Sequence, residues 1–269
     1  MPAENRHAEQ HPSRKESAGV RVARPMLLHR AFAARLGARR FDVLRTLVVP
    51  LVAGLGVVLS LLLFSLLASE VLEGDTHSLD MQLLEAAERF RTAHPRFGVV
   101  MRDLSGLGSA VVLSFLVVAT VIYLALLSAR TSAVLVAAST AAGAVLIHLL
   151  LKPAFGRLRP DLAFADHAAW GMSFPSGHAS MSAIVFLTLG ALLANTRSRW
   201  VERVFILAMA AVATFLVGVS RVALGVHWGT DVLAGWALGA AWAAGWLLVA
   251  HRVLRAERTD RAASGGRRR

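Results

Sequence analysis

Six long runs of apolar residues dominate the hydrophobic pattern of the chain from residue 47 onward. They lie at about residues 47–68, 109–127, 133–151, 179–193, 204–219 and 232–250. Each approaches the roughly 20 helical residues that cross the hydrocarbon core of a bilayer. The two shortest runs, the fourth and fifth, gain a turn if the segments beside them join the helix. The pattern therefore predicts an all-α fold, a polytopic membrane helical bundle with six transmembrane helices.

Polar segments flank and interrupt these runs and define the expected domains. Residues 1–45 form a basic segment that we expect to be cytoplasmic and largely disordered, with a short amphipathic helix over 26–45. Residues 46–251 form the six-helix domain, and residues 252–269 form a basic cytoplasmic tail. Between the first two runs, apolar residues of segment 79–87 share one helical face, which predicts a helix at the membrane interface.

Composition agrees with this membrane assignment and narrows the possible partners. Of the 269 residues, 56% are apolar and 17% are charged, whereas soluble domains carry about 25% charged residues. The chain has no cysteine, which excludes disulfides and Cys-ligated zinc. Its net charge of +12 is concentrated in the two terminal segments. We attribute it to membrane topology and predict no nucleic-acid partner, because no basic-aromatic binding motif is present.

The charged loops predict the orientation of the helices. Arginines occur in the second and fourth connections, at Arg130, Arg197, Arg199 and Arg203, whereas six carboxylates lie between residues 70 and 88. Because cytoplasmic loops are rich in Lys and Arg, both termini are expected in the cytoplasm. The protein is then a multi-pass protein of the cell's inner (plasma) membrane. Segments 152–178 and 220–231 are expected to face the periplasm or exterior.

Three polar islands on that outer side carry the candidate chemistry. They are Lys152–Pro160, Phe174–His178 and Ser220–Asp231. Together they offer several cations, two histidines, one carboxylate and a turn that opens a helix. A transferring phosphoryl group spreads negative charge over its oxygens and needs such cations and oriented N–H groups. A cation alone could equally anchor a helix end among lipid headgroups.

The second and third islands each have a local geometry that suits this chemistry. Ser176 is expected to cap the fourth transmembrane helix, and Gly177 lets a ligand approach the helix N-terminus, where anions bind. His178 follows on the first turn. His227 and Asp231 are four residues apart, so a carboxylate is able to fix one imidazole tautomer and leave the other nitrogen free to attack. Each feature alone is also compatible with an ordinary helix cap or helix end.

Taken together, the three islands resemble the type 2 phosphatidic acid phosphatase family, whose pattern is KxxxxxxRP, PSGH and SRxxxxxHxxxD. The matching residues are Lys152, Arg159-Pro160, Pro175-Ser176-Gly177-His178, Ser220-Arg221, His227 and Asp231. The resemblance covers about residues 105–250. It implies that His227 is the nucleophile, Asp231 its orienting carboxylate and His178 the general acid and base.

The same resemblance assigns phosphate binding to five positions, Lys152, Arg159, Ser176, Gly177 and Arg221. It also implies a reaction without a metal ion or another cofactor. Asp161, Asp166 and His167 are a remote alternative for binding a single ion.

The expected partners are the bilayer and a lipid phosphate: a polyprenyl diphosphate, phosphatidic acid or phosphatidylglycerophosphate. The polyprenyl diphosphate is slightly favoured by analogy with bacterial relatives. A lipid phosphotransferase with the same site is the nearest alternative, and an anion or lipid transporter is an alternative from another class. A transporter usually places ionisable groups near the bilayer midplane, where this sequence has few. The soluble vanadate-dependent haloperoxidases share related residues, but six apolar runs argue against that class. The oligomeric state stays open.

Overall fold

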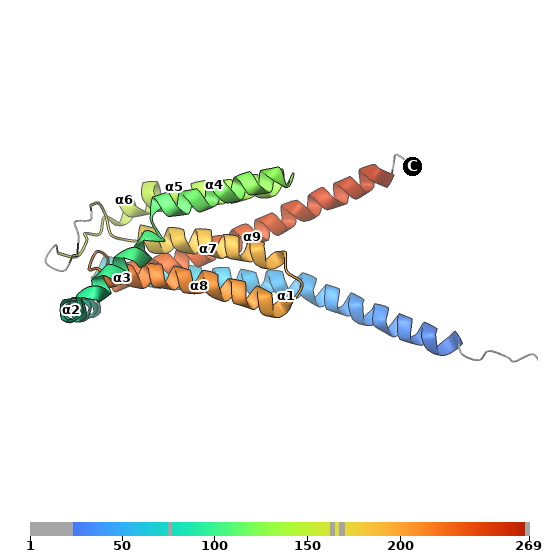
Figure 1. Ribbon diagram of the computed structural model, residues 1–269, viewed down its shortest axis with the longest axis horizontal. Helices are drawn as coiled ribbons and strands as arrows, with labels where there is room; N and C mark the ends of the chain where they lie inside the picture. The colour runs from blue at the N-terminus through green and yellow to red at the C-terminus, as the bar shows by residue number, and fades with distance from the viewer. Residues whose placement is uncertain (1–23, 75–76, 162–164, 167–169, 267–269) are drawn as a thin grey trace, which may run out of the picture. The chain divides into compact units, whose positions relative to one another are not determined.

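The fold is helical throughout the part of the chain that the structure describes. The computed structural model describes residues 24–74, 77–161, 165–166 and 170–266, and no β-strand occurs among them. Figure 1 shows the helices in order. They are α1 (Arg24–Glu73), α2 (His77–Ala93), α3 (Pro95–Gly106), α4 (Ala110–Leu126), α5 (Arg130–Val145), the π-helix η1 (Leu146–Leu151), α6 (Lys152–Phe155), α7 (Gly177–Asn195), α8 (Trp200–Ala223) and α9 (Gly229–Gly266).

Among the described residues, six helical stretches are long and apolar enough to cross a membrane. They are Pro50–Glu73, Pro95–Leu126, Arg130–Phe155, Gly177–Asn195, Trp200–Ala223 and Gly229–Glu257. The second combines α3 with α4, and the third combines α5, η1 and α6. The predicted all-α class and the predicted number of membrane-spanning helices are both confirmed. The interfacial segment predicted around residues 79–87 is also helical, as α2.

Two helices continue where the sequence predicted domain boundaries. Helix α1 starts at Arg24, so the short helix expected over 26–45 and the first transmembrane run are one helix. No proline lies between residues 26 and 49 to end it. Helix α9 continues to Gly266, past the boundary expected at residue 252, since the tail contains good helix formers. The disorder predicted for residues 1–23 falls outside the described residues.

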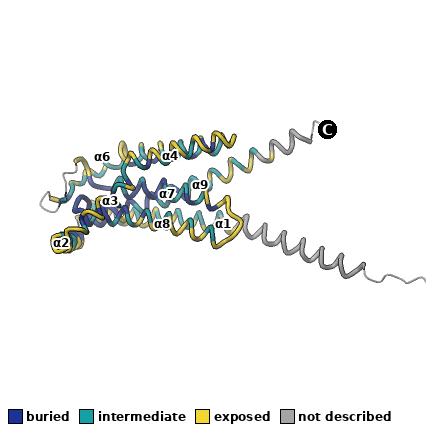
Figure 2. Tube along the Cα trace, viewed as in Figure 1, coloured by how far each residue is buried: buried dark blue, intermediate teal, exposed yellow. Residues whose placement is uncertain are grey.

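The centre of the bundle is formed by α7, which packs against both α8 and α9. Figure 2 shows that buried residues concentrate on these helices, whereas α4 carries many exposed residues. Small residues permit the close approach, as is common between membrane helices. A Cβ added to Gly239 on α9 would lie 2.5 Å from Ala183 Cβ on α7, and one added to Gly218 on α8 would lie 2.3 Å from the Trp236 ring.

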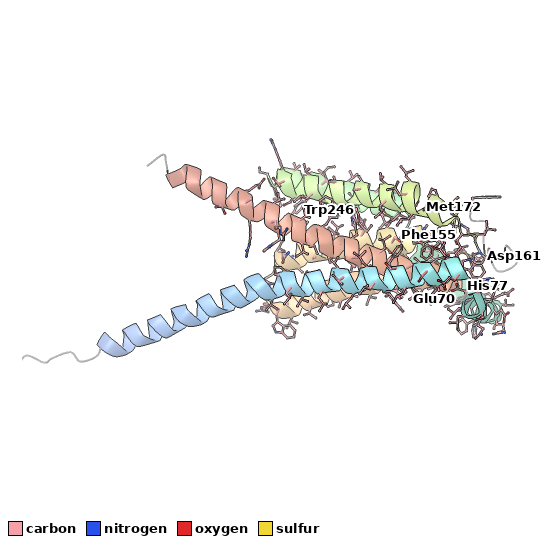
Figure 3. All side chains as sticks on the ribbon, turned by 180° about the vertical axis from the view of Figure 1, so that it is seen from behind. Glu70, His77, Phe155, Asp161, Met172 and Trp246 are labelled. Atoms are coloured by element: carbon pink, nitrogen blue, oxygen red, sulfur yellow. The ribbon has the colours of Figure 1, made fainter. Side chains whose placement is uncertain are left out.

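One end of the bundle collects the polar islands. The π-helix η1 leads directly into α6, which begins at Lys152, and α7 and α9 both begin at this end, where α8 finishes. Figure 3 shows His77, Phe155, Asp161 and Met172 grouped there, with Trp246 well along the bundle toward the other end. Helix α2 contacts both α8 and α9. The fold therefore brings segments that are distant in sequence to one site.

Candidate active site

His227 and Asp231 form a buried pair at the start of α9. His227 lies two residues before the helix, and Asp231 lies on its first turn. His227 Nδ1 is 3.2 Å from Asp231 Oδ2, and the two residues are 1% and 0% exposed. The backbone N–H of Trp228 donates to the same carboxylate oxygen at 3.1 Å. The predicted i, i+4 pair is therefore present, although the ring precedes the helix rather than lying on it.

Arg159 determines which ring nitrogen of His227 carries the hydrogen. Its Nη1 is 3.0 Å from His227 Nε2. A guanidinium only donates hydrogen bonds, so Nε2 must be the acceptor and Nδ1 must carry the hydrogen that faces Asp231. This geometry places one ring nitrogen at the carboxylate, as the hypothesis drawn from the sequence requires. The lone pair of Nε2 accepts from a cation, beside which an oxyanion would bind.

The surroundings keep the imidazole neutral. Burial is the largest cause that lowers the pKa of His227 well below its ordinary value of 6.5, and the charges of Arg159, Arg221 and Lys152 lower it further. Burial likewise lowers the pKa of Arg159 from its ordinary value, while the charge of Asp231 raises it. Arginine stays charged at neutral pH in any case. The site thus combines an uncharged imidazole nitrogen with a fixed positive charge.

The other two predicted cations lie on the same end of the bundle. Arg221 is 5% exposed, and its Nη1 donates to the Ser105 hydroxyl. Its Nε is buried and has no hydrogen-bond partner among the described residues. A buried donor without a partner is costly, and a phosphoryl oxygen would satisfy it. Lys152 Nζ donates to the Met172 carbonyl at 2.6 Å, next to the Gly171 carbonyl that accepts from Arg159 Nε at 3.1 Å.

The Pro-Ser-Gly-His turn joins these parts. Ser176 is fully buried, caps α7 by accepting from the Ala179 N–H, and donates its own N–H to the Asp231 carbonyl at 3.0 Å. A Cβ added to Gly177 would lie 3.7 Å from Lys152 Cε and 3.0 Å from His148 Cε1, so the start of α7 lies beside the lysine. The hydroxyl of Ser176, predicted to bind phosphate, is engaged here as a cap.

His178 follows on the first turn of α7 and is partly buried. Its Cδ2 is 3.4 Å from the position that a Cβ would take on Gly108, at the turn between α3 and α4. The predicted roles of His178 and of the other site residues stay predictions, but the residues themselves gather at one end of the bundle.

Two residues that the sequence did not predict, Arg157 and Asp80, extend the hydrogen-bond network around His227 and Asp231. Arg157 Nη1 donates to Asp231 Oδ1 at 2.7 Å, and Arg157 Nη2 donates to Asp80 Oδ2 at 2.8 Å. Arg157 lies inside the first island, two residues before Arg159, and that position was its only signal in the sequence. Asp80 had none beyond its place on the predicted interfacial helix.

One carboxylate considered for the single-ion site, Asp166, forms an ion pair with an arginine. Asp166 pairs with Arg102 at 2.7 Å, and His167 lies outside the described residues. Within the described ranges, no three His, Asp or Glu side chains are grouped closely enough to hold a metal ion.

Comparison with known proteins shows a similarity between this part of the chain and one protein family. Residues 132–255, which contain every predicted site residue, match the family model described as the PAP2 superfamily. This part of the chain is similar to the PAP2 superfamily. The resemblance drawn from the three polar islands is thereby confirmed.

Individual PAP2 relatives agree. The chain is 41% identical over 97 residues to phosphatidylglycerophosphatase B of Bacillus subtilis, which is 35% of this chain and 46% of that protein. It is 40% identical over 67 residues to an undecaprenyl-diphosphatase of Sulfolobus acidocaldarius, which is 25% of this chain and 28% of that protein. The chain thus spans less than half the length of these curated relatives.

A solved structure extends the likeness to the fold. It is the crystal structure of a transmembrane PAP2-type phosphatidylglycerolphosphate phosphatase from Bacillus subtilis. The TM-score is 0.68 at 28% identity, over 73% of this chain and 96% of that one. The likeness therefore reaches well beyond the segment that the family model matches.

Proposed function

We propose that this protein is an integral membrane lipid phosphatase that hydrolyses a phosphomonoester or diphosphate lipid through a phosphohistidine intermediate. One observation carries the proposal. The buried His227 ring has Nδ1 on the Asp231 carboxylate and Nε2 within 3.0 Å of the Arg159 guanidinium. A nucleophilic nitrogen in a fixed tautomer beside a phosphate-binding cation suits in-line attack on phosphorus.

The first half of the reaction transfers the phosphoryl group to the protein. Arg159, Arg221 and Lys152 hold the phosphoryl oxygens and stabilise the charge that spreads over them. The Nε2 lone pair of His227 forms the N–P bond while the P–O bond to the lipid breaks. His178 donates a proton to the departing lipid oxygen. The ring becomes a phosphorylated imidazolium, whose positive charge the Asp231 carboxylate stabilises.

The second half regenerates the enzyme. Water attacks phosphorus, the N–P bond breaks, and its electron pair returns to Nε2. His178, now deprotonated, accepts the proton that the water loses. Inorganic phosphate then leaves, and both histidines are back in their starting protonation states.

The location of the site supports a lipid substrate. The reacting residues lie at helix ends, where a headgroup reaches them while its tail stays in the bilayer. Leu158, next to Arg159 in sequence, is 82% exposed, and Trp170, next to the Gly171 residue whose carbonyl accepts from Arg159, is 87% exposed. Aromatic residues favour the interface between membrane and water. The names of the relatives point to phosphatidylglycerophosphate and to undecaprenyl diphosphate, so both belong among the substrates tested.

A substrate panel tests the proposal. The purified full chain is assayed in mixed micelles with phosphatidylglycerophosphate, phosphatidic acid and undecaprenyl diphosphate, and released phosphate is measured. We expect turnover of at least one lipid, lost in His227→Ala and retained in His94→Ala. His94, the residue before α3, is a suitable control because its ring contacts Phe90 on α2: Nδ1 lies 3.1 Å from the Phe90 carbonyl, and the two rings stack. No turnover of any lipid, or full turnover by folded His227→Ala, would reject the proposal.

The proposed orientation has both termini in the cytoplasm and the site on the outer side. The chain has no cysteine, so single cysteines report sidedness without background labelling. Glu85 on α2 and Ser198 in the connection between α7 and α8 are both exposed. In intact cells, an impermeant maleimide should label Glu85→Cys, and Ser198→Cys only after permeabilisation. The reverse pattern would contradict the orientation.

A further inference from the structure

Asp80 is a buried carboxylate on the first turn of α2, outside the segment that matches the PAP2 model. It is 0% exposed. Its Oδ1 accepts the backbone N–H of Thr230 at 3.0 Å, and its Oδ2 accepts the Thr230 hydroxyl at 2.6 Å. Its Oδ2 also accepts from Arg157 Nη2 at 2.8 Å. A charge buried this deeply must be paired and hydrogen-bonded, and both of its partners belong to the active-site end.

Arg157 carries this contact onward to the catalytic carboxylate. Its Nη1 donates to Asp231 Oδ1 at 2.7 Å and to Thr230 Oγ1 at 2.8 Å. The guanidinium carbon lies 5.3 Å from the centre of the Trp228 ring, whose Nε1 donates to the Leu158 carbonyl at 2.9 Å. The planar fork of an arginine holds two carboxylates in one fixed geometry, which a lysine does not. The Arg157 guanidinium is therefore held by a carboxylate at each of its two Nη atoms and by the Trp228 ring over its plane.

This clamp sets how Asp231 is rotated. Arg157 holds Oδ1, so Oδ2 is left to face both His227 Nδ1 and the Trp228 N–H. Without the guanidinium, rotation of the carboxylate about its own bond would no longer be opposed at Oδ1. The charges add a second effect, since Asp80 and Asp231 are two carboxylates on one guanidinium. The remaining negative charge complements the cationic ring that forms when His227 is phosphorylated.

We infer that Asp80 and Arg157 are positioning residues for the nucleophile, which makes the outer helix α2 a functional part of the active site. The inference rests on the proposed phosphatase function. Neither residue touches the substrate; Asp80 orients Arg157, Arg157 orients Asp231, and Asp231 orients His227. Their loss should therefore slow the chemical step and leave substrate binding by Lys152, Arg159 and Arg221 nearly intact.

The test uses Asp80→Asn and Arg157→Gln in the full chain with the best substrate of the panel. We expect kcat to fall about 10–100-fold in each, as residues behind a directly acting group typically show, with KM within about threefold. Inhibition by vanadate, a mimic of the phosphoryl-transfer transition state, should weaken by about the same factor as kcat. The double variant should be no slower than the slower single variant, because both residues act along one path.

Two control variants remove outer ion pairs that do not touch Asp231. Glu85→Gln breaks an exposed pair with Arg89 on the same helix, and Arg102→Gln breaks the pair with Asp166. Both should keep the wild-type kcat. A loss of kcat in these controls as large as in Asp80→Asn would overturn the inference, because loosening of the outer segments would then explain it.

Further results of the Asp80 and Arg157 assays also test the inference that these residues position the nucleophile. Asp80→Asn with wild-type melting temperature and wild-type kcat, or single effects that multiply in the double variant, would overturn the inference. If Arg157→Gln does not fold, Arg157→Gly is assayed with added guanidinium; recovery of kcat without a change in KM supports the inference, and no recovery in folded protein rejects it. Wild-type turnover is the internal reference: if the wild type turns over lipid and Asp80→Asn does so equally, only the inference fails, whereas an inactive wild type removes the proposed function as well.

Discussion

Asp231→Asn is the substitution whose consequence follows most directly from the hydrogen bonds. Both carboxylate oxygens accept from donors: Oδ1 from Arg157 at 2.7 Å, and Oδ2 from the Trp228 N–H at 3.1 Å and from His227 Nδ1 at 3.2 Å. An asparagine has the same shape but offers one oxygen and one NH₂ group. The NH₂ group must then face a hydrogen-bond donor, either Arg157 at the Oδ1 position or Trp228 N–H and His227 Nδ1 at the Oδ2 position.

The guanidinium carries a full charge and makes the shortest of these contacts, so the amide oxygen should face Arg157. The NH₂ group then faces His227, which accepts that hydrogen bond only if Nδ1 gives up its hydrogen. In this tautomer Nε2 carries the hydrogen and has no lone pair for attack, and it also opposes the Arg159 N–H. A misoriented tautomer lowers kcat by about 10⁴ in serine proteases, which corresponds to about 5.4 kcal/mol at 1.36 kcal/mol per decade.

The assay is single-turnover release of phosphate from a saturating lipid substrate, with the melting temperature of each variant as the folding check. We expect a loss of about 10³–10⁴ in the chemical rate at a nearly unchanged melting temperature. Asp103→Asn, on α3, is the control for loss of an exposed carboxylate. A folded Asp231→Asn that retains more than about a tenth of the wild-type rate would refute the tautomer argument.

The remaining predictions concern phosphate binding, helix packing and pH. Arg221→Gln should lower kcat/KM about 100-fold or more, as loss of one preorganised donor to a transferring group does, measured by steady-state kinetics. Gly239→Ala should lower the melting temperature, since its Cβ would lie 2.7 Å from a backbone oxygen of α7, whereas Gly245→Ala, with nothing within 4 Å, should not. The buried neutral His227, with its lowered pKa, should make the folded state lose stability as pH falls below about 6.5, by up to about 1.4 kcal/mol per pH unit. This loss occurs because the unfolded chain takes up a proton there and the folded chain does not; thermal unfolding of His227→Asn across pH 5–8 should show a smaller slope.

The six-helix bundle was predictable because each transmembrane helix is specified by its own stretch of sequence. Each apolar run is long enough to span a bilayer by itself, so the number of helices follows from the hydrophobic pattern without knowledge of their packing. The ends of two helices were predicted less accurately, since α1 begins at Arg24 and α9 continues to Gly266. Outside the apolar runs the sequence is polar and charged. Such a composition does not show whether a transmembrane helix continues or ends.

The site was predictable where it is encoded as a pattern. Lys152, Arg159, Arg221, His227 and Asp231 occur at characteristic spacings, and the fold gathers them at one end of the bundle. Asp80 and Ser105 were not predicted, because each is identified only by the residues it contacts across 77 to 150 positions of sequence. Arg157 was marked only by its place inside the first polar island. A single acidic residue on an amphipathic helix has no feature in the sequence that separates it from its exposed neighbours.

The most direct measurement of the central claim is the chemical identity of the trapped intermediate. Wild-type protein is mixed with a substrate radiolabelled at phosphorus, quenched in alkali within the first turnover, digested and analysed by mass spectrometry. The account predicts a phosphate that is stable to alkali, labile to acid and attached to the peptide that contains His227, and it predicts no such label in His227→Ala. Product release with no protein-bound phosphate at any quench time, or a label on a different residue, would contradict it.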